Sequence, residues 1–270
     1  MSTRGVALPG SRLAWGVLEE IAGMLRLTWQ AMRLAVTPPF TWWGEFVEQT
    51  YITVSRCFFP VVVSTLAFGF GNAGVQPGNL LSVFGSVDRS GAFLVAASVR
   101  EFGPWVNAMV IAGIAGTAIC ADLGARKARD ELDALAVMGI DAVRSLVVPR
   151  FLALGIVTAL MNLVAVTCGV LGAMIASTAI FGESIAAFLQ TFTSNFSLPD
   201  LAGSLIKTSL FGFIVAAVCC YKGMTVKGGP EGVGRAVNQA VVIAFAGIWA
   251  FNFMFTALLL GAFPEVGNLH

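Results

Sequence analysis

Charged residues and metal ligands are both scarce in this sequence. Only 11% of its 270 residues are charged, against about 25% in a typical soluble domain, while 57% are hydrophobic. A chain this apolar has too few polar side chains to cover a water-soluble core, so we expect it to face lipid. Its net charge of +1 creates no broad field that would attract nucleic acid, and we expect no nucleic-acid partner.

The few histidines and cysteines argue against a metal centre. The single histidine, His270, is the last residue, and the five cysteines lie in apolar runs without a CxxC pair, so we interpret them as small side chains of the membrane core. The sequence also has no GxxxxGK[ST] loop, the segment that cradles ATP phosphates in many ATPases. We therefore expect no metal, no cofactor and no catalytic residue, and we expect any ATP to be bound by another polypeptide.

Five apolar segments are long enough to cross a bilayer, because a helical crossing needs about 20 apolar residues. These segments are 54–75, 93–121, 146–180, 205–224 and 236–263. The sequence therefore predicts an all-α integral membrane protein with five transmembrane helices. We divide it into an N-terminal cytoplasmic or interfacial helix, residues 1–45, and a membrane domain, residues 46–270.

Basic residues set the expected orientation of these spans. Four arginines precede the first span, five basic residues fall within 126–150, and three more separate the fourth span from the fifth. The opposite side holds little more than Arg89 and Lys207. Because cytoplasmic segments carry an excess of lysine and arginine, we expect the N-terminus in the cytoplasm and the C-terminus outside.

Apolar residues repeat at helical spacing ahead of the first span. Most of the charged residues of this segment, including Glu19, Glu20 and Arg33, fall on other faces. This pattern predicts an amphipathic helix lying in the cytoplasmic membrane interface. The apolar face consists of Leu18, Ile21, Leu25, Trp29, Met32 and Val36.

The segment 126–150 holds nine of the 31 charged residues and lies between two apolar spans. Within it, apolar residues at i, i+3 and i+4 spacing predict a short amphipathic helix over about 128–139, stopped by a glycine. We interpret this helix as a docking element for a cytoplasmic ATPase; the alternative is a helix resting on the membrane surface. Its candidate contact residues are Glu131, Leu132, Asp133, Leu135, Met138 and Gly139.

Three charged residues lie within the predicted spans. Arg100 and Glu101 are in the second span, and Lys207, near the outer end of the fourth, is a candidate partner for them. A lone charge in hydrocarbon costs about 2.5–3.5 kcal/mol on insertion scales, so each should face protein or water. Consecutive helical residues point about 100° apart, so Arg100 and Glu101 should meet different neighbours. We leave open a structural lock between helices and a role in handling substrate.

Small residues mark two further features. Cys168, Gly172 and Ala176 recur at spacing that predicts close contact between helices. The stretch GFGNAG, residues 69–74, matches GxGxxG but ends a membrane span, so we interpret it as a flexible outer turn rather than a nucleotide site.

Taken together, the blocks at 100–127 and 130–150 resemble the central signature of the MlaE/YrbE permeases of bacterial lipid-transporting ABC systems. Residues 48–63, 205–223 and 227–242 resemble the other recurrent blocks of that family. The resemblance implies a dimer of permeases, a pair of cytoplasmic ATPases, an assembly of MCE proteins on the outer side, and a lipid substrate. It places the coupling helix at about 128–139, the intramembrane pair at Arg100 and Glu101, and a cytoplasmic glycine-rich loop at Gly228, Gly229, Gly232 and Gly234.

Two details depart from the general family pattern. Asn252 stands in the fifth span where many relatives carry an acid, and the form GGPEGVGRAV is most similar to the actinobacterial YrbE branch. Unlike paralogues commonly pair in that branch, which favours a heterodimer.

The sequence thus predicts a permease subunit, without its own ATPase, that moves lipids or other hydrophobic molecules across or out of the plasma membrane with MCE proteins. The alternative is a secondary transporter driven by an ion gradient, with Arg100, Glu101 and Lys207 as coupling charges. The absence of a visible internal repeat argues against this alternative. A passive membrane anchor would need neither these charges nor a patterned cytoplasmic helix.

Overall fold

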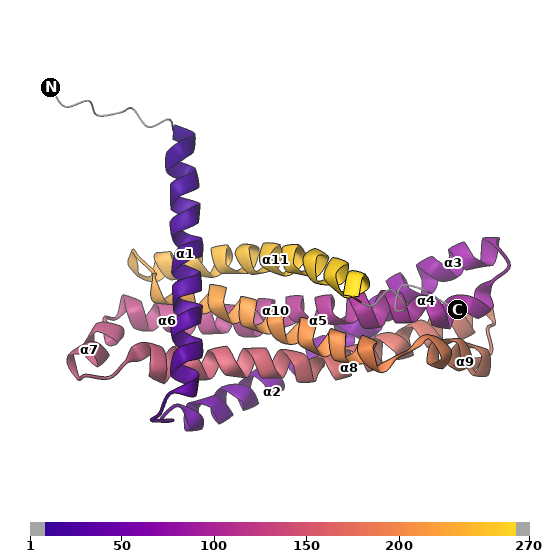
Figure 1. The fold of residues 1–270 in the computed structure, drawn as a ribbon, viewed down its shortest axis with the longest axis horizontal. Coiled ribbons are helices and arrows are strands. Elements are labelled where there is room, and N and C mark those ends of the chain that lie inside the picture. Colours follow the sequence, from indigo (N-terminus) through magenta and orange to yellow (C-terminus); the bar gives the residue numbers. More distant parts are fainter. Residues whose placement is uncertain (1–8, 263–270) are drawn as a thin grey trace.

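The computed structural model describes residues 9–262, and within that range every regular element is a helix (Figure 1). Several π-helical segments, marked η, continue the α-helices on either side. The elements in order are α1 Pro9–Val36, α2 Trp43–Phe68, η1 Gly69–Val75, α3 Gln76–Val83, η2 Val87–Arg89 (a 3-10 turn), α4 Ser90–Leu94, η3 Val95–Phe102, α5 Gly103–Ile111, η4 Ala112–Gly116, α6 Thr117–Ala128, α7 Glu131–Val137, η5 Val143–Val147, α8 Val148–Phe181, α9 Ile185–Asn195, α10 Leu198–Met224 and α11 Gly229–Ala262.

Five helical stretches are long and apolar enough to cross a membrane, which confirms the five predicted spans. Each begins or ends beyond its apolar segment, because the helix continues into the polar flanks. The stretches are Trp43–Val83, Ser90–Ala128, Val143–Phe181, Leu198–Met224 and Gly229–Leu259.

The interpretation of residues 69–74 as a flexible turn is wrong. Residues Gly69–Val75 form η1, which continues α2 into α3 without a break. A side chain at Gly69 would collide with the backbone carbonyl of Gly169, and one at Gly172 would collide with the carbonyl of Leu66. The small residues therefore let two helix backbones touch. This packing confirms the close contact predicted from the small residues of the third span.

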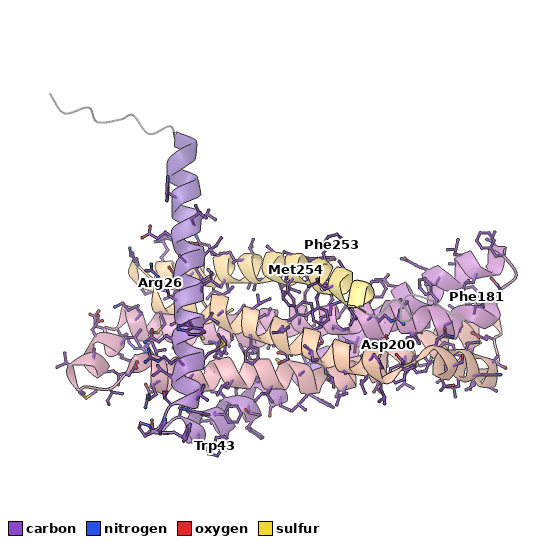
Figure 2. All side chains as sticks on the ribbon, viewed as in Figure 1. Arg26, Trp43, Phe181, Asp200, Phe253 and Met254 are labelled. Carbon is purple, nitrogen blue, oxygen red and sulfur yellow. The ribbon has the colours of Figure 1, made fainter. Side chains whose placement is uncertain are left out.

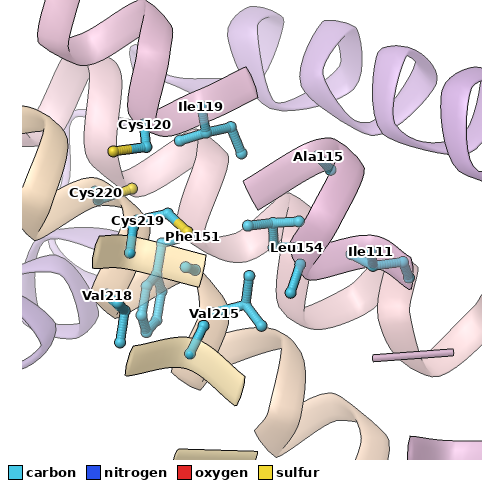
Figure 3. Packing of buried hydrophobic residues seen from close by; sticks show 14 of the residues in the cluster. Ile111, Ala115, Ile119, Cys120, Phe151, Leu154, Val215, Val218, Cys219 and Cys220 are labelled. Carbon is cyan, nitrogen blue, oxygen red and sulfur yellow. The ribbon is translucent and has the colours of Figure 1, made fainter. Parts of the chain in front are cut away.

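The core lies where spans one to five meet near their centres and toward the α7 end. Figure 3 shows Ile111 and Ile119 from the second span packed toward Phe151 and Leu154 of α8, with Val215 of α10 beside them. Four of the five cysteines are fully buried among these side chains and the fifth is half-buried, which confirms that they fill the core of the bundle. They are Cys57, Cys120, Cys219 and Cys220, with Cys168 the half-buried one.

The helix α1 crosses the bundle at a steep angle to the spans instead of running alongside them (Figure 1). Much of its predicted apolar face is exposed, with Trp29 at 69%, and Leu25, Met32 and Val36 border a groove shared with α8, α10 and α11. The opposite face packs inward through Ala31, which is 1% exposed. A helix that crosses the spans runs roughly parallel to the plane of a bilayer, and its position in the membrane interface stays a prediction.

The three basic segments identified in the sequence lie at one end of the bundle. Figure 1 shows that α1, α7 and the start of α11 are all near that end, while α3 and α9 are at the other. A shared end is what the predicted orientation requires, and the cytoplasmic identity of that end stays a prediction. The predicted outer location of the C-terminus concerns residues 263–270, which lie outside the described residues.

Candidate functional site

Six polar side chains meet inside the bundle, and we call them the polar cluster: Arg100, Glu101, Asp200, Lys207, Asn252 and Thr256. They come from three spans. The second span contributes its pair from η3, the fourth contributes two residues from α10, and the fifth contributes two from α11. The π-helical turn of η3 is notable because single π-turns within α-helices occur frequently at functional sites.

Glu101 is the centre of the first half of the polar cluster. Its Oε1 accepts hydrogen bonds from Lys207 Nζ at 3.1 Å and Thr256 Oγ1 at 2.6 Å, and its Oε2 accepts one from Asn252 Nδ2 at 2.8 Å. Lys207 is only 2% exposed, and its Nζ also donates to the backbone oxygen of Arg100 at 2.9 Å. The candidate partner predicted for the intramembrane charges is thereby confirmed: Lys207 pairs with Glu101.

Arg100 forms the second half with a residue that sequence reasoning missed. Its Nε donates to Asp200 Oδ1 at 2.8 Å, and the Asp200 side chain is fully buried. Asp200 also accepts from the backbone and hydroxyl of Ser197, so it closes the capping box at the start of α10. The sequence S-L-P-D, residues 197–200, indicates the start of a helix, but it does not indicate that Asp200 pairs with Arg100. Arg100 and Glu101 do meet different neighbours, as predicted.

The polar cluster is electrically balanced, with two cations and two carboxylates. Asn252 is part of the reason: an acid at that position would add a third negative charge beside Glu101. Because each buried charge has an opposite partner and further hydrogen bonds, the desolvation penalty is offset. The arrangement can hold three spans in register. Within the described residues, no group of three or more potential metal ligands converges.

The helix α7 occupies the centre of the predicted docking segment but is shorter, spanning Glu131–Val137. Asp130 precedes it with a positive φ of 58°, and Gly139 ends the segment with φ of 76°, as the predicted stop requires. Leu132 is buried against its own chain at 6% exposure, so it faces inward. Met138 is 64% exposed and the neighbouring Val137 is 89% exposed. The free apolar surface is therefore at the end of α7.

The acidic residues of α7 are paired with basic residues at and just after the end of α6. Arg129 Nε donates to Glu131 Oε1 at 2.6 Å, and Lys127 Nζ donates to Asp133 at 3.0 Å. The hydrogen bond from Arg129 lowers the pKa of Glu131. These acidic residues, which we call the rim of α7, are thus partly neutralised within the chain.

The predicted glycine-rich loop is only partly a loop, because Gly228 precedes α11 while Gly229, Gly232 and Gly234 belong to its first turns. Three of the four glycines have a structural reason. Gly228 and Gly229 have positive φ values of 90° and 66°, a backbone region that other residues rarely adopt. A side chain at Gly232 would collide with the backbone of Lys227. Gly234 faces open space, and nothing in the packing requires a glycine there.

A second ion-pair network, also missed from the sequence, lies close to α7. Arg150 is 2% exposed, and its Nη2 is 2.8 Å from Asp122 Oδ2 and 3.2 Å from Glu45 Oε1. These residues tie α8 to α6 and α2, beside a cavity of about 300 Å³. Sequence reasoning counted Arg150 among the loop charges, because its position in the first turn of α8 was not evident.

Comparison with known proteins gives a consistent result. The family model described as Permease MlaE matches residues 46–258. A probable ABC transporter permease protein of Synechocystis is 31% identical over 65% of this chain and 67% of its own length. One from Rickettsia typhi is 30% identical over 74% and 77%. The intermembrane phospholipid transport system permease protein MlaE of Haemophilus influenzae is 26% identical over 80% and 83%.

Proposed function

The chain belongs to the MlaE permease family, and from this premise we propose that it moves phospholipid or another hydrophobic molecule across or out of the plasma membrane as the permease subunit of an ABC transporter. It is a multi-pass membrane protein and is not itself an enzyme, since ATP hydrolysis belongs to a separate subunit. The match over residues 46–258, which spans all five transmembrane stretches, carries this proposal.

In our proposal, α7 is the surface on which the ATPase acts. Its exposed Val137 and Met138 offer an apolar contact for the ATPase. Because α7 lies between α6 and α8 in the chain, a movement of α7 is transmitted directly to both of these helices. The buried Arg150 of α8 couples a third helix to this movement, because it pairs with Asp122 of α6 and with Glu45 of α2. A displacement of α7 would therefore move three spans together.

We propose that the polar cluster couples the movement of the second span to the fourth and fifth spans. It joins the second span to α10 through two ion pairs and to α11 through hydrogen bonds from Asn252 and Thr256 to Glu101. Hydrocarbon offers no other polar partner for these groups. Breaking one pair without supplying another partner is costly, so the polar cluster favours a small number of discrete arrangements over gradual sliding. This behaviour suits a permease that alternates between states.

ATPase and MCE subunits are the general partners of such permeases, and we propose a paralogous second permease. We also propose that the N-terminus and α7 are cytoplasmic and the C-terminus is outside. The second permease would cover apolar residues of α11 that point away from the bundle, among them Phe253 and Met254, labelled in Figure 2. Phe253 is 80% exposed, which a lipid or protein neighbour must cover.

The test is transport by the purified complex in liposomes, with a fluorescent phospholipid and a choice of energy source. We expect movement of the lipid to require ATP and a co-purified ATPase, and to be lost when the ATPase is inactivated. Movement driven by an ion gradient in the absence of any ATPase would instead establish the secondary-transporter alternative.

A further inference from the structure

A small polar cavity of about 160 Å³ lies where α1 crosses the adjoining ends of α10 and α11. Its wall includes three cations, Lys222, Lys227 and Arg235, and a single carboxylate, Glu20. Gly232 adds backbone from the first turn of α11, where the helix dipole is positive. The wall therefore has an excess of positive charge, although the chain as a whole is almost neutral.

Lys222 forms the buried side of this cavity. It is 6% exposed, and its Nζ donates to both oxygens of Glu20 at 2.9 Å and to Gln239 Oε1 at 3.1 Å. Its charge is thus balanced, and the bonds join α1 to α10 and α11. The role of this lysine is to hold the wall together.

The other two cations are at the exposed rim. Within the described part of the chain, Lys227 makes no hydrogen bond or ion pair, and Arg235 pairs only with Glu231 at 3.3 Å. Both partners of that pair are exposed, at 62% and 85%, and such a pair contributes little in water. Two cationic groups are therefore available to an incoming anion.

An apolar groove of about 570 Å³ lies one helical turn further along the same two helices. Glu20 and Lys222 line the polar cavity, while Met24 and Val218, each four residues away, line the groove. Phe251 of α11 forms part of the opposite wall. The contact between Gly23 and Tyr221 lies between the two spaces.

We propose that these two spaces together bind one anionic phospholipid of the cytoplasmic leaflet. Its phosphate lies against Lys227 and Arg235, and an acyl chain lies in the apolar groove under α1. The juxtaposition of a cation-lined cavity with an apolar groove matches the two chemically different parts of such a lipid. This site goes beyond the proposed transport function, because it is beside α1 and separate from the polar cluster.

The experiment compares lipid retention by the purified complex in native mass spectrometry, after exposure to phosphatidylglycerol or phosphatidylcholine. Wild type should retain one phosphatidylglycerol under detergent conditions that remove other lipids, and less phosphatidylcholine. The double variant Lys227→Gln/Arg235→Gln should lower this retention about tenfold, equivalent to a loss of roughly 1.4 kcal/mol. The charge-conserving variant Lys227→Arg/Arg235→Lys should keep it.

Two further variants test the location. Ala217→Phe narrows the apolar groove without altering charge and should also reduce retention, while Arg89→Gln, at the opposite end of the molecule, should leave it unchanged. Equal retention by wild type and the double glutamine variant would overturn the proposal.

Excess inorganic phosphate separates a lipid from a free anion. A lipid site keeps its phosphatidylglycerol, and displacement by phosphate alone would show a site for a soluble anion instead. Retention is measured without ATP, so its outcome does not depend on the transport assay and the two proposals fail separately.

Discussion

Lys207 on α10 and Glu101 on η3 are joined by a 3.1 Å ion pair between the fourth and second spans, and the lysine is almost completely buried. Neither residue has a second charged partner of opposite sign within 4 Å among the described residues. The pair therefore behaves as a unit, and removing one member leaves the other without its counterion.

We expect Glu101→Gln and Lys207→Met each to destabilise the permease by up to about 3 kcal/mol, because each leaves a lone charge between helices. Glu101 is about one-third exposed, which places this value at the low end for a buried pair. The double variant should lose less than the sum of the two, since no unpaired charge remains. Thermal unfolding of the purified protein measures all three; additive losses would show that the two charges act independently.

Arg100→Gln should leave membrane insertion intact but impair transport or complex stability, because buried Asp200 loses its counterion. Membrane abundance measures insertion, and the liposome assay measures transport.

At Asp200 itself, Asn and Ala both remove the ion pair, but Asn keeps an oxygen that can accept from Ser197 in the capping box, whereas Ala does not. We expect Asp200→Ala to be about 1 kcal/mol less stable than Asp200→Asn. Membrane abundance and melting temperature report the effect, and identical melting of the two variants would rule out the capping role.

Charged substitutions in α7 should separate docking from folding. Leu135 is half-buried and Met138 is exposed, so Leu135→Asp and Met138→Asp add a charge to the surface of α7 without placing it in the core. We expect normal membrane levels with loss of the ATPase on co-purification. Leu132→Asp buries a charge within the permease and should lower its abundance instead. The readout is the ratio of ATPase to permease, at low and moderate salt.

The rim charges provide a milder test of the same surface. Glu131→Lys with Asp133→Lys would place these lysines beside Arg129 and Lys127, their present partners. Because a rim charge chiefly alters association rate and salt dependence, we expect a smaller loss than for Leu135→Asp. If all of these α7 variants keep a full complement of ATPase and normal transport, α7 does not couple the two subunits.

Two neighbouring glycines of α11 should respond in opposite directions to the same change. Gly232→Ala should destabilise the first turn of α11, because the new methyl group meets the backbone of Lys227, which cannot easily move. Gly234→Ala should be neutral or stabilising by about 0.5–1 kcal/mol, since the site is open and helical. A shift of melting temperature in the same direction for both variants would contradict this explanation of the loop.

The sequence predicted the spans well because length and hydropathy alone decide whether a helix can cross a membrane. It also predicted that Lys207 would pair with the charges of the second span, since an unpaired charge within the membrane has a high free-energy cost. It did not reveal that Asp200 pairs with Arg100 or that Asn252 bonds to Glu101. These contacts depend on the rotation of α10 and α11 about their axes, which the sequence does not specify. The error at Gly69 has a similar origin: glycine permits both a turn and a close helix contact, and only the packed structure distinguishes them.

The crosswise position of α1 has a consequence for how deeply the bundle is immersed. Helix α8 has 34 residues and is therefore about 51 Å long, well beyond the roughly 30 Å of bilayer hydrocarbon. With α1 in the predicted membrane interface, held to α10 by Lys222 and by the close approach of Gly23 to Tyr221, the depth of the bundle in the bilayer would be fixed on that side. The part of α8 that exceeds the bilayer would then extend mainly beyond the opposite interface. There α3 and α9 would project from the membrane and form a surface for an external partner.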